Sequence, residues 1–194
     1  MKPGPIRLVV VGASLGGLTA LRILLGGLPR DFSAALAIVQ HRRAASDSRL
    51  RELLSGASRL PLIEPDDKEP LQAGHVYLAP ANYHMLVGGG TLWLSIDAPV
   101  IFARPSIDVL FESAADALGA EVMAVVLTGS SDDGAAGARA IKRAGGLVLV
   151  QDPADAESPA LPRATIAATP VDAVLALPAL CERVMALVAE GNGK

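Results

Sequence analysis

Serine, histidine and aspartate side chains stand at three separated points of this sequence, and together they could perform nucleophilic catalysis. Ser14 lies within residues 12–16, Gly-Ala-Ser-Leu-Gly, which fit the pattern G-x-S-x-G of an exposed nucleophile in a tight turn. His41 and the pair Asp132 and Asp133 each follow a different apolar run. A nucleophile, base and acid are defined by geometry and role, so their separation along the chain does not exclude such a group.

The glycine turn around Ser14 also resembles a nucleotide-binding loop. A dinucleotide site needs G-x-G-x-x-G and an acidic residue at the end of the second strand. Ser14 occupies the place of the middle glycine, and the second apolar run ends in Gln40 and His41. The Gly-Lys-Ser/Thr of a P-loop is missing as well. Both nucleotide sites are therefore disfavoured, whereas a flavodoxin-like phosphate loop stays open.

Each candidate residue has a simpler structural role open to it. Ser14 could cap the helix that follows, and either aspartate could cap the next one, because both residue types are favoured at helix N-termini. His41 could be an ordinary surface residue at a strand end. Catalysis is favoured by position, since catalytic groups of an open parallel sheet gather at the carboxyl ends of its strands.

The elements expected to position these residues alternate between strand and helix. Continuous apolar runs predict strands buried on both faces, as in parallel sheets, at residues 6–11, 34–40, 122–127 and 147–151. Shorter strands are expected at residues 60–63 and 75–80, and loops at 64–70 and 152–162. Helical spacing of apolar residues predicts helices over 18–28, 107–118, 135–144 and 175–189, and a further helix is expected to begin at Ser46 or Asp47 and to end at Gly56.

The middle of the chain departs from this alternation. Residues 84–87 and 92–96 flank three consecutive glycines, which predicts an antiparallel hairpin. The sequence therefore predicts a single α/β domain over residues 1–194. Its fold class is a doubly wound, mainly parallel sheet with helices on both faces, right-handed crossovers and an inserted antiparallel β-hairpin.

Composition narrows the classes of function. The chain of 194 residues is 51% hydrophobic, has a net charge of -3 and contains no run of five basic residues, which argues against nucleic-acid or anionic-membrane binding. No apolar run reaches the roughly 18 residues of a membrane span, and no signal-peptide pattern is seen, so a cytoplasmic location is expected. The one cysteine, Cys181, excludes an intrachain disulfide. The histidines lack zinc-like spacing, and neither a metal nor another cofactor is expected.

Several segments taken together resemble the catalytic domain of the CheB family, the chemotaxis receptor methylesterases. The likeness is carried by the serine turn at 12–17, by Gln40 and His41, and by residues 127–137. Further matching segments are 74–80, 84–85, 104–111, 144–146, 151–152 and 161–163. The resemblance covers nearly the whole chain and includes no segment like the phosphorylatable receiver domain of the family.

The resemblance implies a serine hydrolase that removes methyl esters from glutamyl side chains of chemoreceptor cytoplasmic helices, with glutamine deamidation as a related activity. Carried over residue by residue, it implies Ser14 as nucleophile, His41 as base and Asp133 as the acid that orients the imidazole. The backbone N–H groups of Leu15 and Ser130 would be the oxyanion donors. No cofactor is implied. The expected partner is the cytoplasmic domain of a methyl-accepting chemoreceptor, and a separate receiver or kinase protein is a further candidate.

The chain departs from the family pattern around the expected substrate groove. Leu15 replaces the usual threonine or alanine, Ser130 and Ser131 replace methionine and glycine, and Arg42 replaces methionine, while Pro159-Ala160 stands where the family has Phe-Gly. The preference for protein partners is therefore expected to differ from that of the family more than the catalytic chemistry does.

Arg104, Arg42 and His84 are expected to bind the substrate. The two arginines would steer carboxylates that lie near receptor methylation sites, whereas Arg43 is expected to be an ordinary solvated arginine. Two other functions stay open, a non-catalytic binding module of the same fold and a small-molecule esterase.

Overall fold

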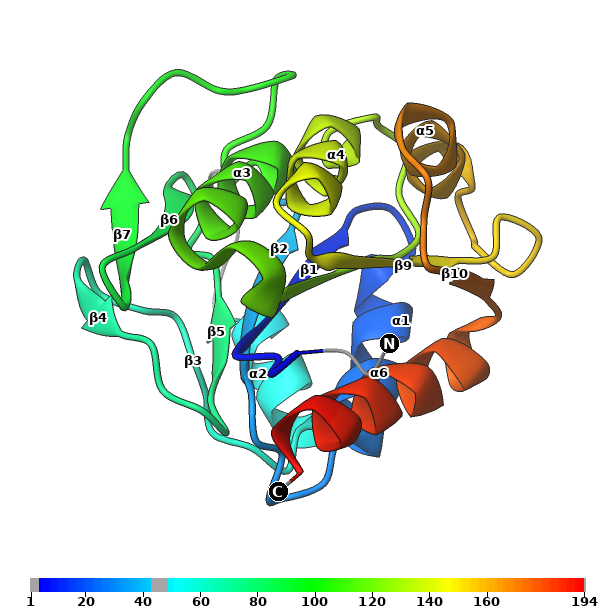
Figure 1. The fold of residues 1–194 in the computed structure, drawn as a ribbon. Helices are drawn as coiled ribbons and strands as arrows, with labels where there is room; N and C mark the ends of the chain where they lie inside the picture. Colours follow the sequence, from blue (N-terminus) through cyan, green and yellow to red (C-terminus); the bar gives the residue numbers. More distant parts are fainter. Residues whose placement is uncertain (1–3, 43–48, 194) are drawn as a thin grey trace.

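A seven-stranded parallel sheet forms the centre of the computed structural model, which describes residues 4–42 and 49–193 (Figure 1). Its strands run in the order β10-β9-β8-β1-β2-β5-β3. Their bounds are β1 Leu8–Ala13, β2 Ala35–Gln40, β3 Leu62–Ile63, β5 Val76–Leu78, β8 Val122–Val126, β9 Leu147–Gln151 and β10 Ala173–Leu175. The predicted fold class is confirmed, and so are the four long buried strands.

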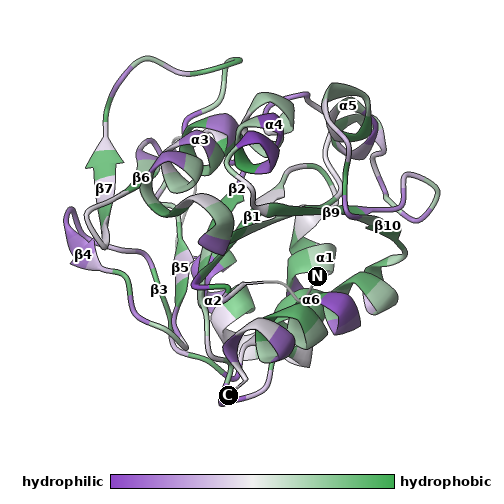
Figure 2. Ribbon diagram, in the orientation of Figure 1, coloured by the Kyte–Doolittle hydropathy of each residue, from purple (hydrophilic) through white to green (hydrophobic). Residues whose placement is uncertain are grey.

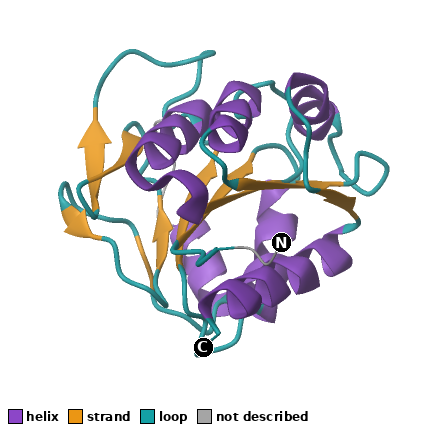
Figure 3. Ribbon diagram, viewed as in Figure 1, coloured by secondary structure: helices purple, strands orange, loops and turns teal. Residues whose placement is uncertain are grey.

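Helices cover both faces of this sheet, and in Figure 3 the purple helices form two layers with the orange strands of the sheet between them. On one face lie α1 Gly17–Gly27, α2 Arg49–Ala57 and α6 Leu177–Asn192, and on the other lie α3 Ile107–Leu118, α4 Ala135–Arg143 and α5 Ala160–Ala168. Successive residues of a strand point to opposite faces, so Val9 and Val11 pack in one core and Leu8 and Val10 in the other. Figure 2 shows the resulting apolar colouring of the central strands.

The expected hairpin is present and belongs to a second, three-stranded antiparallel sheet. Its strands β4 Glu69–Pro70, β6 His84–Gly88 and β7 Thr91–Ser95 lie in the order β4-β7-β6. β4 falls in a segment that was expected to be a loop, since Glu69 and Pro70 have little strand propensity. The two residues form a strand because they pair with β7.

The C-terminal third departs from expectation at two further places. α5 begins within the expected loop 152–162. The helix tolerates Pro162 because this residue lies in its first turn, where the missing N–H costs no helical hydrogen bond. β10 occupies the start of the expected helix 175–189, which begins instead at Leu177 as α6. The helix cap expected at Ser46 or Asp47, and Arg43, lie outside the described residues.

The register of three neighbouring strands brings the candidate residues to one edge of the sheet. Gly12 of β1 lies opposite Val39 of β2 and Val126 of β8 in the two parallel ladders. Ser14, His41 and the loop after β8 therefore leave the sheet side by side. In the part of the chain that the structure describes, no helix has the length and apolarity needed to cross a membrane.

Candidate active site

The turn after β1 holds Ser14 through backbone contacts to two neighbouring segments. The Ser14 N–H donates to the Thr128 carbonyl oxygen at 2.9 Å, and the Ser14 carbonyl oxygen accepts from Gln40 Nε2 at 2.7 Å. Gly16 has φ +79°, and a Cβ there would lie 2.7 Å from the Glu157 Cβ, so glycine is required. Gly16 is also the N-cap of α1, and no side chain caps it. The alternative role of Ser14 as a helix cap is therefore wrong.

His41 is held against the same turn and is directed to Asp133. Its N–H donates to the Ala13 carbonyl oxygen at 2.9 Å, and its Nε2 lies 2.6 Å from Asp133 Oδ2. Side-chain exposure is 15% for His41 and 0% for Asp133. Because Nε2 faces the carboxylate, Nδ1 is the ring nitrogen left to exchange a proton with another group.

Asp133 is a buried carboxylate with several hydrogen-bond donors around it. Besides His41, it accepts from Ser106 Oγ at 2.7 Å and from the backbone N–H groups of Ile107 and Asp108, at 2.8 and 3.0 Å, in the first turn of α3. Burial alone would raise the pKa of this carboxyl, but the hydrogen bonds from His41, α3 and Ser106 outweigh it and hold the pKa below its ordinary value. Asp133 is therefore ionised at neutral pH and can fix the proton on His41 Nε2.

Asp132, the rival for this role, does not contact His41. It is exposed, and its backbone carbonyl oxygen accepts from the Ala135 N–H at 3.0 Å. The N-cap of α4 is Gly134, with no side-chain cap, so neither aspartate serves as the cap considered above.

The two residues expected to supply the oxyanion donors line the cavity that contains Ser14. Within the described residues, the N–H groups of Leu15 and Ser130 donate no hydrogen bond to protein. Both residues line a cavity of about 560 Å³ together with Ser14 and His41. The loop passes close to the nucleophile candidate, since a Cβ on Gly129 would lie 3.0 Å from the Ser14 Cβ. This geometry suits stabilisation of a developing oxyanion.

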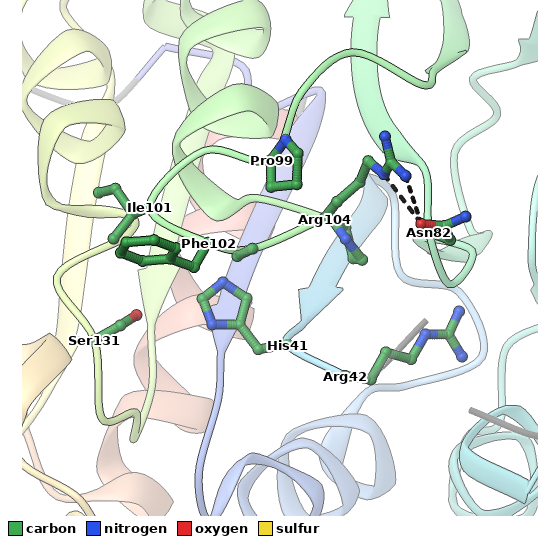
Figure 4. Close-up of a pocket in the computed structure, with 10 residues that line it drawn as sticks. His41, Arg42, Asn82, Pro99, Ile101, Phe102, Arg104 and Ser131 are labelled. Atoms are coloured by element: carbon green, nitrogen blue, oxygen red, sulfur yellow. Dashed lines mark hydrogen bonds between the residues drawn. The ribbon is translucent and has the colours of Figure 1, made fainter. Parts of the chain in front are cut away.

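A second cavity, of about 550 Å³, opens on the other side of His41. Figure 4 shows residues that line it, including Phe102 above the imidazole, Ser131 to the left of it and Arg104 hydrogen-bonded to Asn82. His41 lines both cavities, so it stands between them.

Arg104 borders this second cavity, but most of its hydrogen-bond donors are occupied by acceptors within the protein. Its Nη1 donates to the carbonyl oxygens of Ile96 and Asp97 at 2.7 and 3.0 Å. Its Nε and Nη2 donate to Asn82 Oδ1 at 3.1 and 2.7 Å. The side chain therefore braces the segment before it, and substrate binding by Arg104 stays a prediction.

Arg42 does not serve the steering role expected of it. Its side chain is only 6% exposed, and Nη2 contacts Glu64 Oε1 and the Ala79 carbonyl oxygen, each at 2.5 Å. The guanidinium charge is thus already paired inside the protein, which leaves little for substrate carboxylates.

His84 was expected at the substrate and is instead buried, with 1% exposure. Its Nδ1 accepts from the Ser106 N–H at 3.2 Å, so Nε2 carries the proton that is donated to the Ala98 carbonyl oxygen at 3.1 Å. His84 therefore positions Ser106, which in turn donates to Asp133.

Sequence reasoning missed the residues that hold the candidate site in place. Ser106, Gln40 and Asp108 act through partners far away in the chain, so local patterns carried little signal for them. For Ser106 a signal existed, because Pro-Ser before an apolar helical pattern is a helix start, and Ser106 is the N-cap of α3.

Asp108 is a second buried carboxyl beside Asp133, and it accepts from the N–H groups of Gly134 and Gly137 at 2.9 and 2.7 Å. Burial, together with the charge of Asp133, raises its pKa to about 6 despite these two hydrogen bonds. The folded chain thus binds this proton more tightly than the unfolded chain. The contribution of Asp108 to the free energy of unfolding is expected to fall by about 3 kcal/mol as pH rises from about 4 to about 6, and then to level off.

Asp108→Asn is expected to remove this contribution, because the amide oxygen still accepts both N–H groups and carries no charge. Urea unfolding of both proteins between pH 4 and 7 measures the difference, in which the opposite contribution of Asp133 cancels. Parallel pH profiles of the two proteins would contradict the prediction.

The described residues contain no group of three or more histidine, cysteine, aspartate or glutamate side chains suited to a metal ion.

Comparison with known proteins gives the family. The CheB methylesterase family model matches residues 9–184. The chain belongs to the CheB methylesterase family. A CheB relative from Leptospira interrogans, a putative protein-glutamate methylesterase/protein-glutamine glutaminase, is 43% identical over 175 residues, which are 90% of this chain and 91% of that protein.

Other CheB relatives are longer than this chain. The protein-glutamate methylesterase/protein-glutamine glutaminase 2 of Anaeromyxobacter dehalogenans is 44% identical over 170 residues, 88% of this chain and 50% of that protein. The protein-glutamate methylesterase/protein-glutamine glutaminase of Bordetella pertussis is 41% identical over 184 residues, 92% of this chain and 52% of that protein. The chain thus spans about half the length of these two relatives.

The fold matches a solved CheB structure. The crystal structure of the Thermotoga maritima CheB methylesterase catalytic domain aligns with a TM-score of 0.89 and 30% identity, covering 94% of this chain and 99% of that one.

Proposed function

We propose that this protein is a serine hydrolase that removes methyl esters from glutamyl side chains of chemoreceptor cytoplasmic helices, and that it also deamidates glutamines there. The names of its relatives support both activities on glutamate and glutamine side chains of a protein, and the resemblance to chemotaxis receptor methylesterases supports a chemoreceptor as that protein. The observation that carries the chemistry is the 2.6 Å contact between His41 and the buried Asp133 at the sheet edge where Ser14 stands.

The reaction follows from the orientation of the imidazole. Ser14 Oγ attacks the γ-carbonyl carbon while His41 Nδ1 takes the hydroxyl proton. Asp133 keeps the other proton on Nε2 and stabilises the imidazolium. His41 then protonates the departing methoxide, which leaves as methanol. Water, deprotonated by Nδ1, attacks the acyl-enzyme and restores glutamate and the free Ser14 hydroxyl.

The negative charge that forms on the carbonyl oxygen would be met by the N–H groups of Leu15 and Ser130. Each such donor is worth about 3 kcal/mol in serine hydrolases. These are backbone groups, so the departures in side-chain type at the two positions leave the donors in place.

Glu157 brings a carboxylate to the rim of the Ser14 cavity. It is exposed, and its Oε2 lies 2.8 Å from where a Cβ on Gly16 would be. A negative charge there opposes the developing oxyanion and repels acidic substrates. Glu157→Gln is therefore expected to raise kcat/KM for methanol release roughly threefold at low salt.

Because exposed charges are screened, this gain should disappear near 0.5 M NaCl, which a salt series on both proteins would test. A Glu157→Gln protein that is slower than the unsubstituted one at low salt would show instead that Glu157 assists the reaction.

Methanol release from a methyl-esterified chemoreceptor cytoplasmic fragment tests the proposed function directly. A higher kcat/KM for short-chain p-nitrophenyl esters than for the fragment would favour a small-molecule esterase. Absence of both activities, together with no labelling by a fluorophosphonate, would favour the binding module. Action on the receptor also implies a cytoplasmic location, and a separate receiver or kinase protein stays a candidate regulatory partner.

A further inference from the structure

Residues 101 and 102 form a tight turn whose backbone suits neither of them. Val100 and Ala103 exchange two backbone hydrogen bonds, of 3.1 and 2.8 Å, around Ile101 and Phe102. Both turn residues are left-handed, with φ +46° and +62°. Two consecutive left-handed residues favour Asn-Gly, and a β-branched isoleucine there is strained.

The same two side chains are exposed beside the candidate site. Phe102 is 102% exposed and Ile101 is 44% exposed, and both line the cavity that His41 also lines. They therefore contribute little to the core while costing backbone strain. Strain of this kind concentrates at functional positions, which points to a role in recognition.

Side-chain hydrogen bonds tie the segment before the turn to the rest of the protein. Arg104 ties the preceding Ile96 and Asp97 carbonyl oxygens to Asn82, and His84 Nε2 donates to the Ala98 carbonyl oxygen. Phe102 is thus presented on a fixed support, which lowers the entropy lost when a partner binds.

The cavity indicates the chemistry of the partner. Its described lining contains no carboxylate, and the Arg42 charge is paired with Glu64. Arg104 donates to neutral carbonyl and amide oxygens, so its positive charge is not balanced by a carboxylate in these contacts and favours an acidic surface. A side chain that enters the cavity toward His41 cannot also cover Phe102, which projects into solvent. On the far side of His41, Leu15 is 56% exposed in the Ser14 cavity, so apolar side chains flank the imidazole on both sides. An amphipathic helix carries an apolar strip beside a charged face and therefore fits both features.

We propose that the Ile101-Phe102 turn is the docking element for an acidic amphipathic helix of the protein substrate. Phe102 packs on the apolar strip of that helix, and the ester side chain reaches Ser14. This proposal rests on the proposed function and adds the residues that distinguish a protein substrate from a small ester.

The double variant Ile101→Asn/Phe102→Gly tests it, because it supplies a favoured turn and removes both side chains. We measure kcat/KM for methanol release from a methyl-esterified chemoreceptor fragment and for p-nitrophenyl acetate hydrolysis. The ratio of the two is expected to fall at least about tenfold, mainly through KM for the fragment. The midpoint of thermal unfolding is expected to rise by a few degrees as strain is relieved.

Two single variants serve as controls. Phe102→Leu keeps an apolar side chain and is expected to hold the ratio within about threefold of the unsubstituted protein. Ile166→Asn removes an apolar side chain on α5 that is 38% exposed, about as exposed as Ile101, and is expected to leave the ratio unchanged.

An unchanged ratio in the double variant, or an equal loss with both substrates, would overturn the docking role while the proposed function stands. A lower unfolding midpoint would also overturn it, since the side chains would then support the fold. Failure of the unsubstituted protein to release methanol from the fragment would reject the proposed function, and the docking role with it.

Discussion

Ser14→Ala is expected to abolish methanol release from a methyl-esterified chemoreceptor fragment, with kcat lowered by about 10⁶-fold, as for the nucleophile of other serine hydrolases. The substitution removes the attacking oxygen and leaves the backbone contacts of the turn in place. In the described part of the chain, the Ser14 hydroxyl makes no hydrogen bond that folding would lose. Stability should therefore change little, which thermal unfolding measures.

Thr19→Ala is the matched control, because Thr19 is an exposed hydroxyl residue lining the same cavity. It should retain activity and fluorophosphonate labelling, and Ser14→Ala should lose both. Methanol release by Ser14→Ala at the unsubstituted rate would exclude Ser14 as the nucleophile.

Asp133→Asn is expected to lower kcat by about 10⁴-fold, the loss seen when the acid of a serine-hydrolase triad becomes an amide. An amide can donate its N–H to His41 Nε2, which moves the imidazole proton to Nδ1. Nδ1 could then no longer accept the proton of Ser14. The donors that now surround the carboxylate, from Ser106 and the first turn of α3, would also lose a charged acceptor, so the free energy of unfolding should fall.

Asp132→Asn provides the comparison at the adjacent position. Its side chain is exposed and has no contact with His41, so kcat should stay within about twofold of the unsubstituted value. Steady-state kinetics of the two variants give the ranking. Greater loss in Asp132→Asn than in Asp133→Asn would transfer the orienting role to Asp132.

The central strands could be predicted because each is buried on both faces, so an unbroken apolar run identifies it. β4 and β10 could not, since two or three residues carry no periodicity and become strands only through their neighbours. α5 was not predicted, because Pro162 argues against a helix unless it lies in the first turn, and the sequence did not show where the helix begins.

For the candidate site, the sequence predicted which residues follow the strand ends, but not which side chains contact one another. The sequence placed Ser14, His41 and the Asp132-Asp133 pair at one edge of the sheet, and the ladders of β1 with β2 and β8 agree. The same reasoning predicted that Arg42 and His84 bind the substrate, because it used only their residue types. It could not predict that Arg42 pairs with Glu64 or that His84 contacts Ser106.

By itself, then, the sequence determined the α/β alternation, the serine turn and the edge of the sheet where chemistry is expected. These depend on periodicity and turn preferences that act over a few residues. Only the tertiary structure decided that Asp133 faces His41 Nε2, that His84 is buried and that Phe102 stands exposed beside the imidazole. Those outcomes depend on contacts between residues far apart in the chain, whose geometry no local pattern contains.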